Sequence, residues 1–430
     1  MGAFVIRGCE IYLGGAFVPA ELEVRGGVVT ALGGGIVPGE GASVYNFKNC
    51  IVVPGLADVH VHLREPGFSY KETVASGTRA AARSGYAALC AMPNLSPVPE
   101  DAATLAQELE IIRRDAVIDV LPYGAITRGQ RGEQLADMAA MSPNVCGFSD
   151  DGRGVQPREL MRAAMLEAKR LGRPIAAHCE DNSLLRGGYI HEGEYAKAHG
   201  HRGICSESEW GPIARDIELL RETGCAYHVC HISTAESAAL IRSAKREGLD
   251  ITCETAPHYL LLSDSDLQEE GRFKMNPPLR SERDRLALIE ALRDGTIDIL
   301  ATDHAPHSAE EKSRGQLVQR LSTPARQLHG EGQLVSLHAA DRKGPPQKEA
   351  RQRDLHELTR PRRAFRIAPQ AQEAQARGRK LRPGECKYAL FHARHTSRPL
   401  TTFKTQRPRT SRPAKGVALP LEAKRSGSIL

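Results

Sequence analysis

The segment 58–67, DVHVHLREPG, places two histidines on either side of one valine, directly after the apolar run 51–56. In an extended strand, residues i and i+2 point to the same side, so His60 and His62 project together. Two imidazoles at one strand end supply half of the ligands of a typical metal site. A pair of surface histidines on an edge strand is the alternative interpretation of so short a motif.

Further polar residues that can bind a metal or hydrogen-bond follow other strand-like runs. They are Asn94 in AMPN, Asp150 and Asp151 in GFSDDG, His178 in AAHCED, His231 in VCHIS and Asp303 in LATDHAPH. Each later histidine, taken singly, is more often a hydrogen-bonded core or loop residue than a ligand. Four histidines and two aspartates that all stand at strand ends predict a metal site jointly.

Neutral imidazoles and carboxylates suit zinc, and this many ligands suit two ions. A carboxylate can bridge two cations with its two oxygens, and Asp151 is the predicted bridge. The predicted division places His60, His62 and Asp303 on one ion and His178 and His231 on the other. Asp150 is expected to lie behind the ligands or in solvent. Two zinc ions acidify a shared water and polarise a carbonyl, which is the chemistry that hydrolyses or forms an amide-type C–N bond.

Two residues near the predicted ions have expected roles in the reaction. Asp303 is expected to shuttle a proton between the attacking water and the substrate nitrogen. Arg64 follows His62 by two residues, and its guanidinium can hold a substrate carboxylate in bidentate fashion. An ordinary surface ion pair is the alternative for Arg64.

The elements that must position these residues alternate between strands and helices from about residue 51. Eight strands are predicted at 56–62, 87–92, 117–123, 145–149, 174–178, 226–231, 251–255 and 297–302, with helical patterns such as 102–115, 157–172 and 208–224. Capping boxes are predicted at Ser206 with Glu209 and at Ser233 with Glu236. Eight strands with crossovers favour an α/β fold, a (β/α)8 TIM barrel, over a doubly wound sheet, because no Gly-x-Gly-x-x-Gly follows the first strand.

The ends of the chain differ from this barrel region of residues 54–315. Residues 1–53 hold short β-rich runs with Gly-rich turns and predict a small, antiparallel β domain. Residues 1–315 carry 33 Lys+Arg against 44 Asp+Glu, and residues 316–430 carry 25 against 8, which sums to the net charge of +6. Ile and Val fall from 37 to 5 across the same point. We expect residues 316–430 to form an atypical basic tail without regular structure.

Targeting signals and cysteine usage indicate a compartment. The N-terminus shows no signal-peptide pattern, and no apolar run is long enough to span a bilayer. The ten cysteines include no Cys-x-x-Cys pair. A cytoplasmic, reducing setting is therefore expected, with no membrane partner.

Eight motifs in order give a specific resemblance over residues 1–315. They are PGLADVHVHLREPG, AMPN, GFSDDGRGV, AAHCED, CHIST, ETAPHYL, KMNPPLR and ATDHAPH. Together they resemble the class I bacterial dihydroorotases of the amidohydrolase superfamily. The resemblance implies reversible, zinc-dependent cyclisation of N-carbamoyl-L-aspartate to L-dihydroorotate in pyrimidine biosynthesis. It also implies two Zn²⁺ per subunit and leaves a homo-oligomer or an aspartate carbamoyltransferase partner open.

The resemblance carries roles onto matching residues. By motif, His60, His62, Asp151, His178, His231 and Asp303 match the zinc ligands, and Asp303 also matches the catalytic acid/base. The substrate contacts match His62, Arg64, Asn94, Asn276 and His307. His258 and His304 are interpreted as structural histidines.

Two alternatives to a dihydroorotase remain. Dihydropyrimidinases, hydantoinases and allantoinases share the first His-x-His and the late aspartate, but they bridge their metals with a strand-four lysine where this chain has GFSDDG. A non-catalytic, dihydroorotase-like subunit that supports aspartate carbamoyltransferase would typically lack metal histidines, which are all present here.

The family pattern stops at about Gly315, where the basic segment begins. A natural basic tail that binds nucleic acid or acidic partners lacks a supporting RNA-binding motif. A divergent completion of the small domain is a second possibility. The preferred hypothesis is a reading-frame shift near codon 315, which would remove the last barrel helix and the substrate-covering loop. Poor solubility and little or no activity of this chain would follow.

Overall fold

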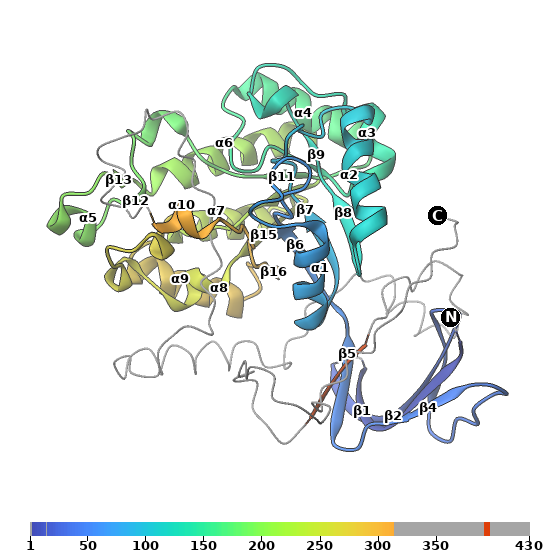
Figure 1. The fold of residues 1–430 in the computed structure, drawn as a ribbon. Helices are drawn as coiled ribbons and strands as arrows, with labels where there is room; N and C mark the ends of the chain where they lie inside the picture. The colour runs from blue at the N-terminus through green and yellow to red at the C-terminus, as the bar shows by residue number, and fades with distance from the viewer. Residues whose placement is uncertain (1, 14, 314–390, 396–430) are drawn as a thin grey trace. The chain divides into compact units, whose positions relative to one another are not determined.

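The computed structural model describes residues 2–13, 15–313 and 391–395, which fall into two compact units (Figure 1). Of these residues, 2–57, 79–88 and 391–395 belong to the first unit, and 58–78 and 89–313 belong to the second. The remainder of the predicted basic tail lies outside the described residues.

The first unit is built on a mixed β-sheet. Its strands are β1 (Phe4–Leu13), β2 (Ala16–Arg25), β3 (Val28–Gly33), β4 (Ser43–Asn46), β5 (Cys50–Pro54) and β17 (Phe391–His395), in the order β17-β5-β1-β2-β3, with β4 paired to β1. The β1–β2, β2–β3 and β5–β17 pairs are antiparallel. The β1–β4 and β1–β5 pairs are parallel. The prediction of an antiparallel unit was therefore wrong in part, because the segment 34–42 is long enough to return the chain for parallel pairing.

Strand β17 corrects the expectation for the C-terminal region over five residues. Phe391–His395 pairs antiparallel with Cys50–Pro54, so this stretch does have regular structure. An edge strand offers unpaired backbone N–H and C=O groups to any extended segment, whatever its side-chain pattern. Composition alone therefore did not reveal this pairing.

The α/β part contains a strand at each of the eight predicted positions. These strands are β6 (Leu56–Val61), β7 (Tyr86–Ala91), β8 (Asp119–Pro122), β10 (Phe148–Ser149), β11 (Ile175–Ala177), β14 (Tyr227–Val229), β15 (Ile251–Thr255) and β16 (Ile299–Leu300). Short additional strands are β9 (Gly124–Ala125), β12 (Ile190–His191) and β13 (Gly203–Ile204). The eight predicted strands are confirmed, although most are shorter than expected.

The hydrogen-bonded strands form two sheets where one closed ring was expected. One sheet has the order β6-β7-β8, and the other has the order β9-β10-β11-β14-β15-β16. A single parallel bridge, Val61 to His304, lies between the first strand and the segment after the last. Backbone hydrogen bonds still cross both breaks between the sheets: the N–H of His62 donates to the His304 carbonyl at 2.9 Å, and the N–H of Cys146 donates to the Pro122 carbonyl at 3.0 Å.

Helices follow most of the strands. They are α1 (Val74–Arg83), α2 (Ala102–Asp115), α3 (Met138–Met141), α4 (Arg158–Arg170), α5 (Glu194–His199), α6 (Glu207–Thr223), α7 (Ala235–Arg246), α8 (Pro257–Leu261), α9 (Glu282–Arg293) and α10 (Ala309–Ser313). Single 3-10 turns lie at Arg128–Gln130, Ser142–Asn144, Asn182–Leu184, Asp264–Asp266 and Gly271–Phe273. Neighbouring helices α4, α6, α7 and α9 pack against one another in chain order.

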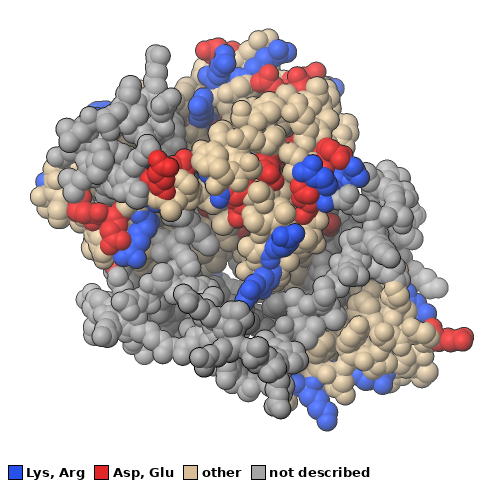
Figure 2. Space-filling model, in the orientation of Figure 1, with Lys and Arg blue, Asp and Glu red and all other residues tan. Residues whose placement is uncertain are grey.

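Helix α4 shows how these helices attach to the sheet. It buries Met161, Ala164, Met165 and Ala168, which recur at the spacing of one helical face. None of the helices in the described part of the chain is both long and apolar enough to cross a membrane. On the face that Figure 2 shows, acidic and basic side chains of the described residues are interspersed.

Both predicted capping boxes were wrong. Ser206 precedes α6 with a helical backbone and makes no side-chain cap. Thr234, and not Ser233, caps α7 through the backbone N–H of Ser237. Glu209 instead reaches this second helix start, where its Oε1 accepts from the N–H groups of Ser233 at 2.9 Å and Thr234 at 3.0 Å. The local four-residue pattern did not reveal that tertiary contact.

Candidate metal centre

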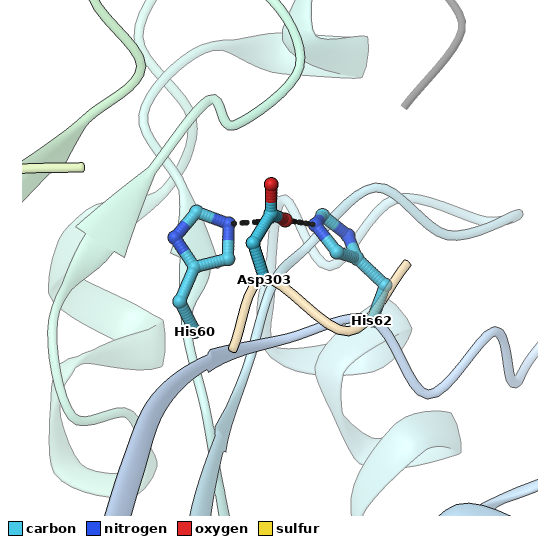
Figure 3. A group of neighbouring side chains, drawn as sticks. All are labelled: His60, His62 and Asp303. Atoms are coloured by element: carbon cyan, nitrogen blue, oxygen red, sulfur yellow. Dashed lines mark ion pairs between the residues drawn. The ribbon is translucent and has the colours of Figure 1, made fainter. Parts of the chain in front are cut away.

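The first histidine pair and the late aspartate meet at the end of the parallel strands (Figure 3). His60 lies in β6, His62 follows it, and Asp303 follows β16. Asp303 Oδ1 lies 3.5 Å from His60 Nε2 and 3.3 Å from His62 Nε2. Figure 3 shows both rings turned toward that carboxylate. The three buried side chains could hold one metal ion.

Asp151, just after β10, lies at the middle of the cluster. Its Oδ2 faces His62 Nε2 at 3.4 Å. Its Oδ1 faces His60 Nε2 at 3.4 Å and His231 Nε2 at 3.3 Å. A single carboxylate therefore contacts imidazoles from two different strand ends with its two oxygens. His60, Asp151 and His231 form a second group with the spacing of metal ligands.

His178 follows β11, and His231 follows β14, its parallel neighbour. The His178 Nδ1 atom lies 3.0 Å from His231 Nε2 and 3.5 Å from Asp151 Oδ1. The opposite ring nitrogen, Nε2, lies 3.7 Å from Glu180 Oε2 and 3.5 Å from Asn276 Nδ2. All six residues predicted as metal ligands are thus brought together in one buried cluster.

Three residues at this end of the strands adopt the left-handed backbone region. Their φ angles are +61° at Arg64, +31° at His231 and +48° at Asp303. Residues other than Gly, Asn and Asp rarely adopt this region, because Cβ crowds the following carbonyl, so Arg64 and His231 are the strained positions among the three. Such strained positions cluster at functional sites, where the surrounding packing holds them.

The carboxylates and imidazoles stabilise each other's charged forms. Burial by itself would raise the pKa of Asp151, but the imidazoles of His60 and His178 hold that pKa well below its ordinary value. Burial would likewise raise the pKa of Asp303, which His60 and His62 lower. For His60, burial opposes protonation, but Asp151, Glu254 and Asp303 raise its pKa well above the ordinary value. The pocket is therefore built to hold positive charge between carboxylates.

Two buried carboxylates behind the cluster were missed by the sequence analysis. Asp58 Oδ1 accepts from the backbone N–H groups of His60 and Thr302, both at 3.2 Å. Glu254 in β15 contacts His60 Nδ1 with its Oε1 at 2.6 Å. Asp58 lies in the quoted motif PGLADVHVH and Glu254 in ETAPHYL. A carboxylate inside a predicted strand was the available signal for both.

Of three predicted substrate-contact residues, Asn94 contacts a ligand of the cluster, and Arg64 and His307 have contacts elsewhere. Arg64 is 2% exposed, and its Nε donates to the Pro306 carbonyl at 3.2 Å. The Asn94 Oδ1 atom lies 2.8 Å from His62 Nδ1, which orients the other ring nitrogen toward the aspartates. His307 Nδ1 lies 3.1 Å from Glu311 Oε2. Asn94 therefore positions His62, a role that the sequence analysis did not assign.

Asp150 and His304 lie outside the ligand cluster. Asp150 Oδ1 accepts from the N–H groups of Ile126 at 2.8 Å and Thr127 at 3.1 Å, which fixes the strand end beside β9. His304 Nε2 lies 2.7 Å from Glu72 Oε2. His258 is buried, and burial lowers its pKa to about 4 despite the nearby Asp303. The contacts of Asp150 and His304 agree with structural or supporting roles.

The residues of the cluster fit a divalent metal. His60 Nε2 and Asp303 Oδ2 are buried and have no hydrogen-bond partner among the described residues. Leaving such atoms unsatisfied costs about 1–3 kcal/mol each. Imidazole and carboxylate ligands are typical of Zn²⁺, and a cation placed among them would satisfy both orphaned atoms.

Comparison with known proteins identifies the family. A family model described as Dihydro-orotase-like matches residues 49–237. The dihydroorotase of Fusobacterium nucleatum subsp. nucleatum is 49% identical over 313 residues, which cover 72% of this chain and 73% of that protein. The dihydroorotase of Enterococcus faecalis is 49% identical over 302 residues, covering 70% and 71% respectively.

Solved structures support the same α/β amidohydrolase fold. The L-hydantoinase (dihydropyrimidinase) of Arthrobacter aurescens superimposes with a TM-score of 0.67 at 22% identity, covering 78% of this chain and 75% of that one. At that identity the likeness concerns the fold alone. The matches to these two dihydroorotases cover more than two thirds of this chain and of each relative, at almost half identity. This chain therefore belongs to the dihydroorotase family.

Proposed function

We propose that the buried cluster binds two zinc ions and catalyses the reversible cyclisation of N-carbamoyl-L-aspartate to L-dihydroorotate and water. The observation that carries this proposal is the position of Asp151, whose two oxygens face imidazoles from separate strand ends. Family membership supplies the substrate class. The number of zinc ions and the role of each residue are part of the proposal.

The proposed ligand division has a geometric basis. His60, His62 and Asp303 are assigned to one ion, supported by contacts of 3.3 and 3.5 Å. His178 and His231 are assigned to the other, supported by the 3.0 Å approach of their ring nitrogens. Asp151 is assigned to both ions, because it is in contact with members of each set.

The chain's own groups would bind the substrate and move the proton. When bound, the metal ions supply Lewis acidity toward a water and an amide carbonyl. Asp303 would accept the proton of the attacking water at Oδ2 and deliver it to the ring nitrogen as the C–N bond breaks. In cyclisation the same carboxylate would take the proton from the attacking carbamoyl nitrogen and return it to the carboxylate oxygen that leaves as water when its C–O bond breaks. Arg64 would bind the substrate carboxylate, with Asn94, Asn276 and His307 as further contacts.

The bridging position favours this activity over the related cyclic amidohydrolases. Dihydropyrimidinases, hydantoinases and allantoinases are expected to carry a lysine where this chain has Asp151. A non-catalytic subunit that only supports aspartate carbamoyltransferase would need no ligand set. Here the complete set lies together in one buried cluster. Aspartate carbamoyltransferase remains a candidate partner of the catalytic chain in the cytoplasm.

We propose the following domain organisation: a small β domain at residues 1–53, a (β/α)8 barrel at 54–315, and a segment at 316–430 outside the family pattern. The match to both relatives covers at most 313 residues, which agrees with a pattern that ends near residue 315. A reading-frame shift near codon 315 accounts for the reversal of charge there. An intact single frame across that codon in independent isolates would contradict the frameshift.

Metal analysis paired with a dihydroorotate hydrolysis assay tests the function. The purified 430-residue chain should contain about two zinc ions per chain and hydrolyse dihydroorotate slowly or not at all. A chain with the reading frame restored after codon 315 should hydrolyse it at a rate that a chelator abolishes and Zn²⁺ restores. A metal-free preparation that resists reloading would contradict the metal centre, and an inactive, metal-loaded restored chain would contradict the activity.

A further inference from the structure

Glu254 lies in β15, in contact with two residues of the metal centre. It is the fourth residue of β15 and has an exposed fraction of 0%. Strand β15 lies between β14, which leads to His231, and β16, which leads to Asp303. A charged side chain at such a position is costly to bury unless its partners repay the lost hydration.

One oxygen of Glu254 contacts two of the proposed metal ligands. Oε1 lies 2.6 Å from His60 Nδ1 and 3.2 Å from the backbone N of His231. Oε1 accepts from the backbone N–H of His231, and the same oxygen faces His60 Nδ1 as a hydrogen-bond acceptor. His60 therefore donates from Nδ1, which leaves the lone pair of Nε2 directed at Asp151 and Asp303.

The contact with His231 fixes a backbone rather than a ring. His231 has a φ of +31°, a conformation that costs free energy and needs support from its surroundings. The hydrogen bond from its N–H to Glu254 provides such support and sets the direction in which its side chain leaves the strand. One carboxylate thus fixes histidines that are assigned to different ions.

The other oxygen of Glu254 is held from the opposite side by His228. Oε2 lies 3.2 Å from His228 Nε2, and His228 Nδ1 lies 2.8 Å from Thr252 Oγ1. His228 and Thr252 are directly paired on β14 and β15. A chain of side-chain contacts therefore runs from Thr252 through His228 and Glu254 to His60. It includes more residues than an isolated histidine–carboxylate pair.

We propose that Glu254 is a positioning residue for the metal centre, which sets the His60 ring and the His231 backbone, and that His228 acts through Glu254. This inference rests on the proposed metal-binding function. Residues of this kind orient ligands and increase their basicity, and their loss typically weakens metal binding by about 10–100-fold. An ion pair that only stabilises the strand layer would not act on the metal.

The test uses Glu254→Gln, His228→Gln and the double variant in the full 430-residue chain. Zn²⁺ affinity is measured by competition with a chelator, and ligand geometry by the visible absorption of the Co²⁺-loaded protein. Glu108→Gln is the matched control, since Glu108 is an equally buried glutamate on α2 outside the metal cluster. It should leave Zn²⁺ affinity and the Co²⁺ spectrum unchanged.

Glu254→Gln should weaken Zn²⁺ binding by about 10–100-fold and shift the Co²⁺ spectrum. His228→Gln should do the same to a smaller extent. The double variant should bind Zn²⁺ no more weakly than Glu254→Gln alone, because both residues act on one path. Wild-type affinity and spectrum in Glu254→Gln would overturn the proposal, and additive losses would overturn the role of His228.

Two further results of the experiment also distinguish the proposals: a Glu254→Gln variant that does not fold, and a wild-type chain that binds no metal. If Glu254→Gln does not fold, the Co²⁺ spectrum of His228→Gln decides: a shift supports the proposal and an unchanged spectrum overturns it. If the wild-type chain itself takes up no metal, the proposed function fails. Normal metal uptake by the wild-type chain and by both single variants rejects the positioning role alone.

Discussion

The two compact units bury charge very differently. Among the described residues of the first unit, Glu23 is the one charged residue that is buried. The core of this unit consists of apolar residues such as Ile11, Leu22 and Val52. The second unit buries His60, Asp151 and Glu254 together at 0–3% exposure. Burying charge is unfavourable unless it is compensated. The first core therefore serves stability, and the concentrated charge of the second indicates chemistry.

The strands of the two units also differ in how completely they are buried. In β1 buried and exposed positions are mixed, as in a sheet with one solvated face. In β11 and β14 every residue is buried, as in parallel strands covered on both faces. A parallel sheet covered in this way offers its strand ends as the place where polar groups can converge.

The largest expected effect comes from Asp303. In the chain with its frame restored, Asp303→Asn should lower dihydroorotate turnover by about 10²–10⁴-fold, because it removes the acid/base group and a proposed ligand. Asp294→Asn, at the end of α9, is the control and should retain activity. Equal losses in both variants would break the distinction between a chemical centre and ordinary charge.

A substitution in the core of the first unit should lower stability and leave the metal centre unchanged. Ile11 is 1% exposed, so Ile11→Ala should lower the free energy of unfolding by about 2–5 kcal/mol through lost burial and a cavity. Val37, which is 85% exposed, supplies the control Val37→Ala with an expected change within about 0.5 kcal/mol. Urea unfolding measures both. Zn²⁺ content should not change, and a loss of metal would contradict the separation of roles.

Acid sensitivity should be traceable to His191 in the second unit. Burial, and then the nearby Arg280 guanidinium, lower the pKa of His191 to about 4. The unfolded chain binds this proton below about 6.5 and the folded chain does not, so stability falls as the pH drops from about 6.5 to 4. His191→Gln should reduce that fall in urea midpoints between pH 7.5 and 4.5. An unchanged slope would exclude His191 as the cause.

The smallest effect is expected from exposed ion pairs. Glu222 contacts Arg158 at 3.1 Å and Arg162 at 3.0 Å, with about half of each side chain exposed. Glu222→Gln should change the free energy of unfolding by less than about 1 kcal/mol and should matter less in high salt. Thermal unfolding at two salt concentrations measures this. A larger effect would mean that surface charge also contributes substantially to the second unit.

The ligand cluster was predictable because its signals are local. A His-x-His pair at a strand end and later His or Asp residues at other strand ends must converge wherever parallel strands share one edge. The supporting residues were not predictable in this way. Asn94 was expected to bind substrate and lies against His62, and Glu209 was expected to cap α6 and reaches α7. Their partners are distant in sequence, so no local pattern specifies them.

The sequence by itself determined the order of strands and helices, the six candidate ligands and the family, because these depend on periodicity, residue type and motif. The tertiary structure decided which groups orient those ligands, the mixed pairing of the first sheet and the joining of β17 to β5. These depend on hydrogen bonds between segments far apart in the chain. Such bonds form only where the fold brings two groups together, which the local sequence around neither residue specifies.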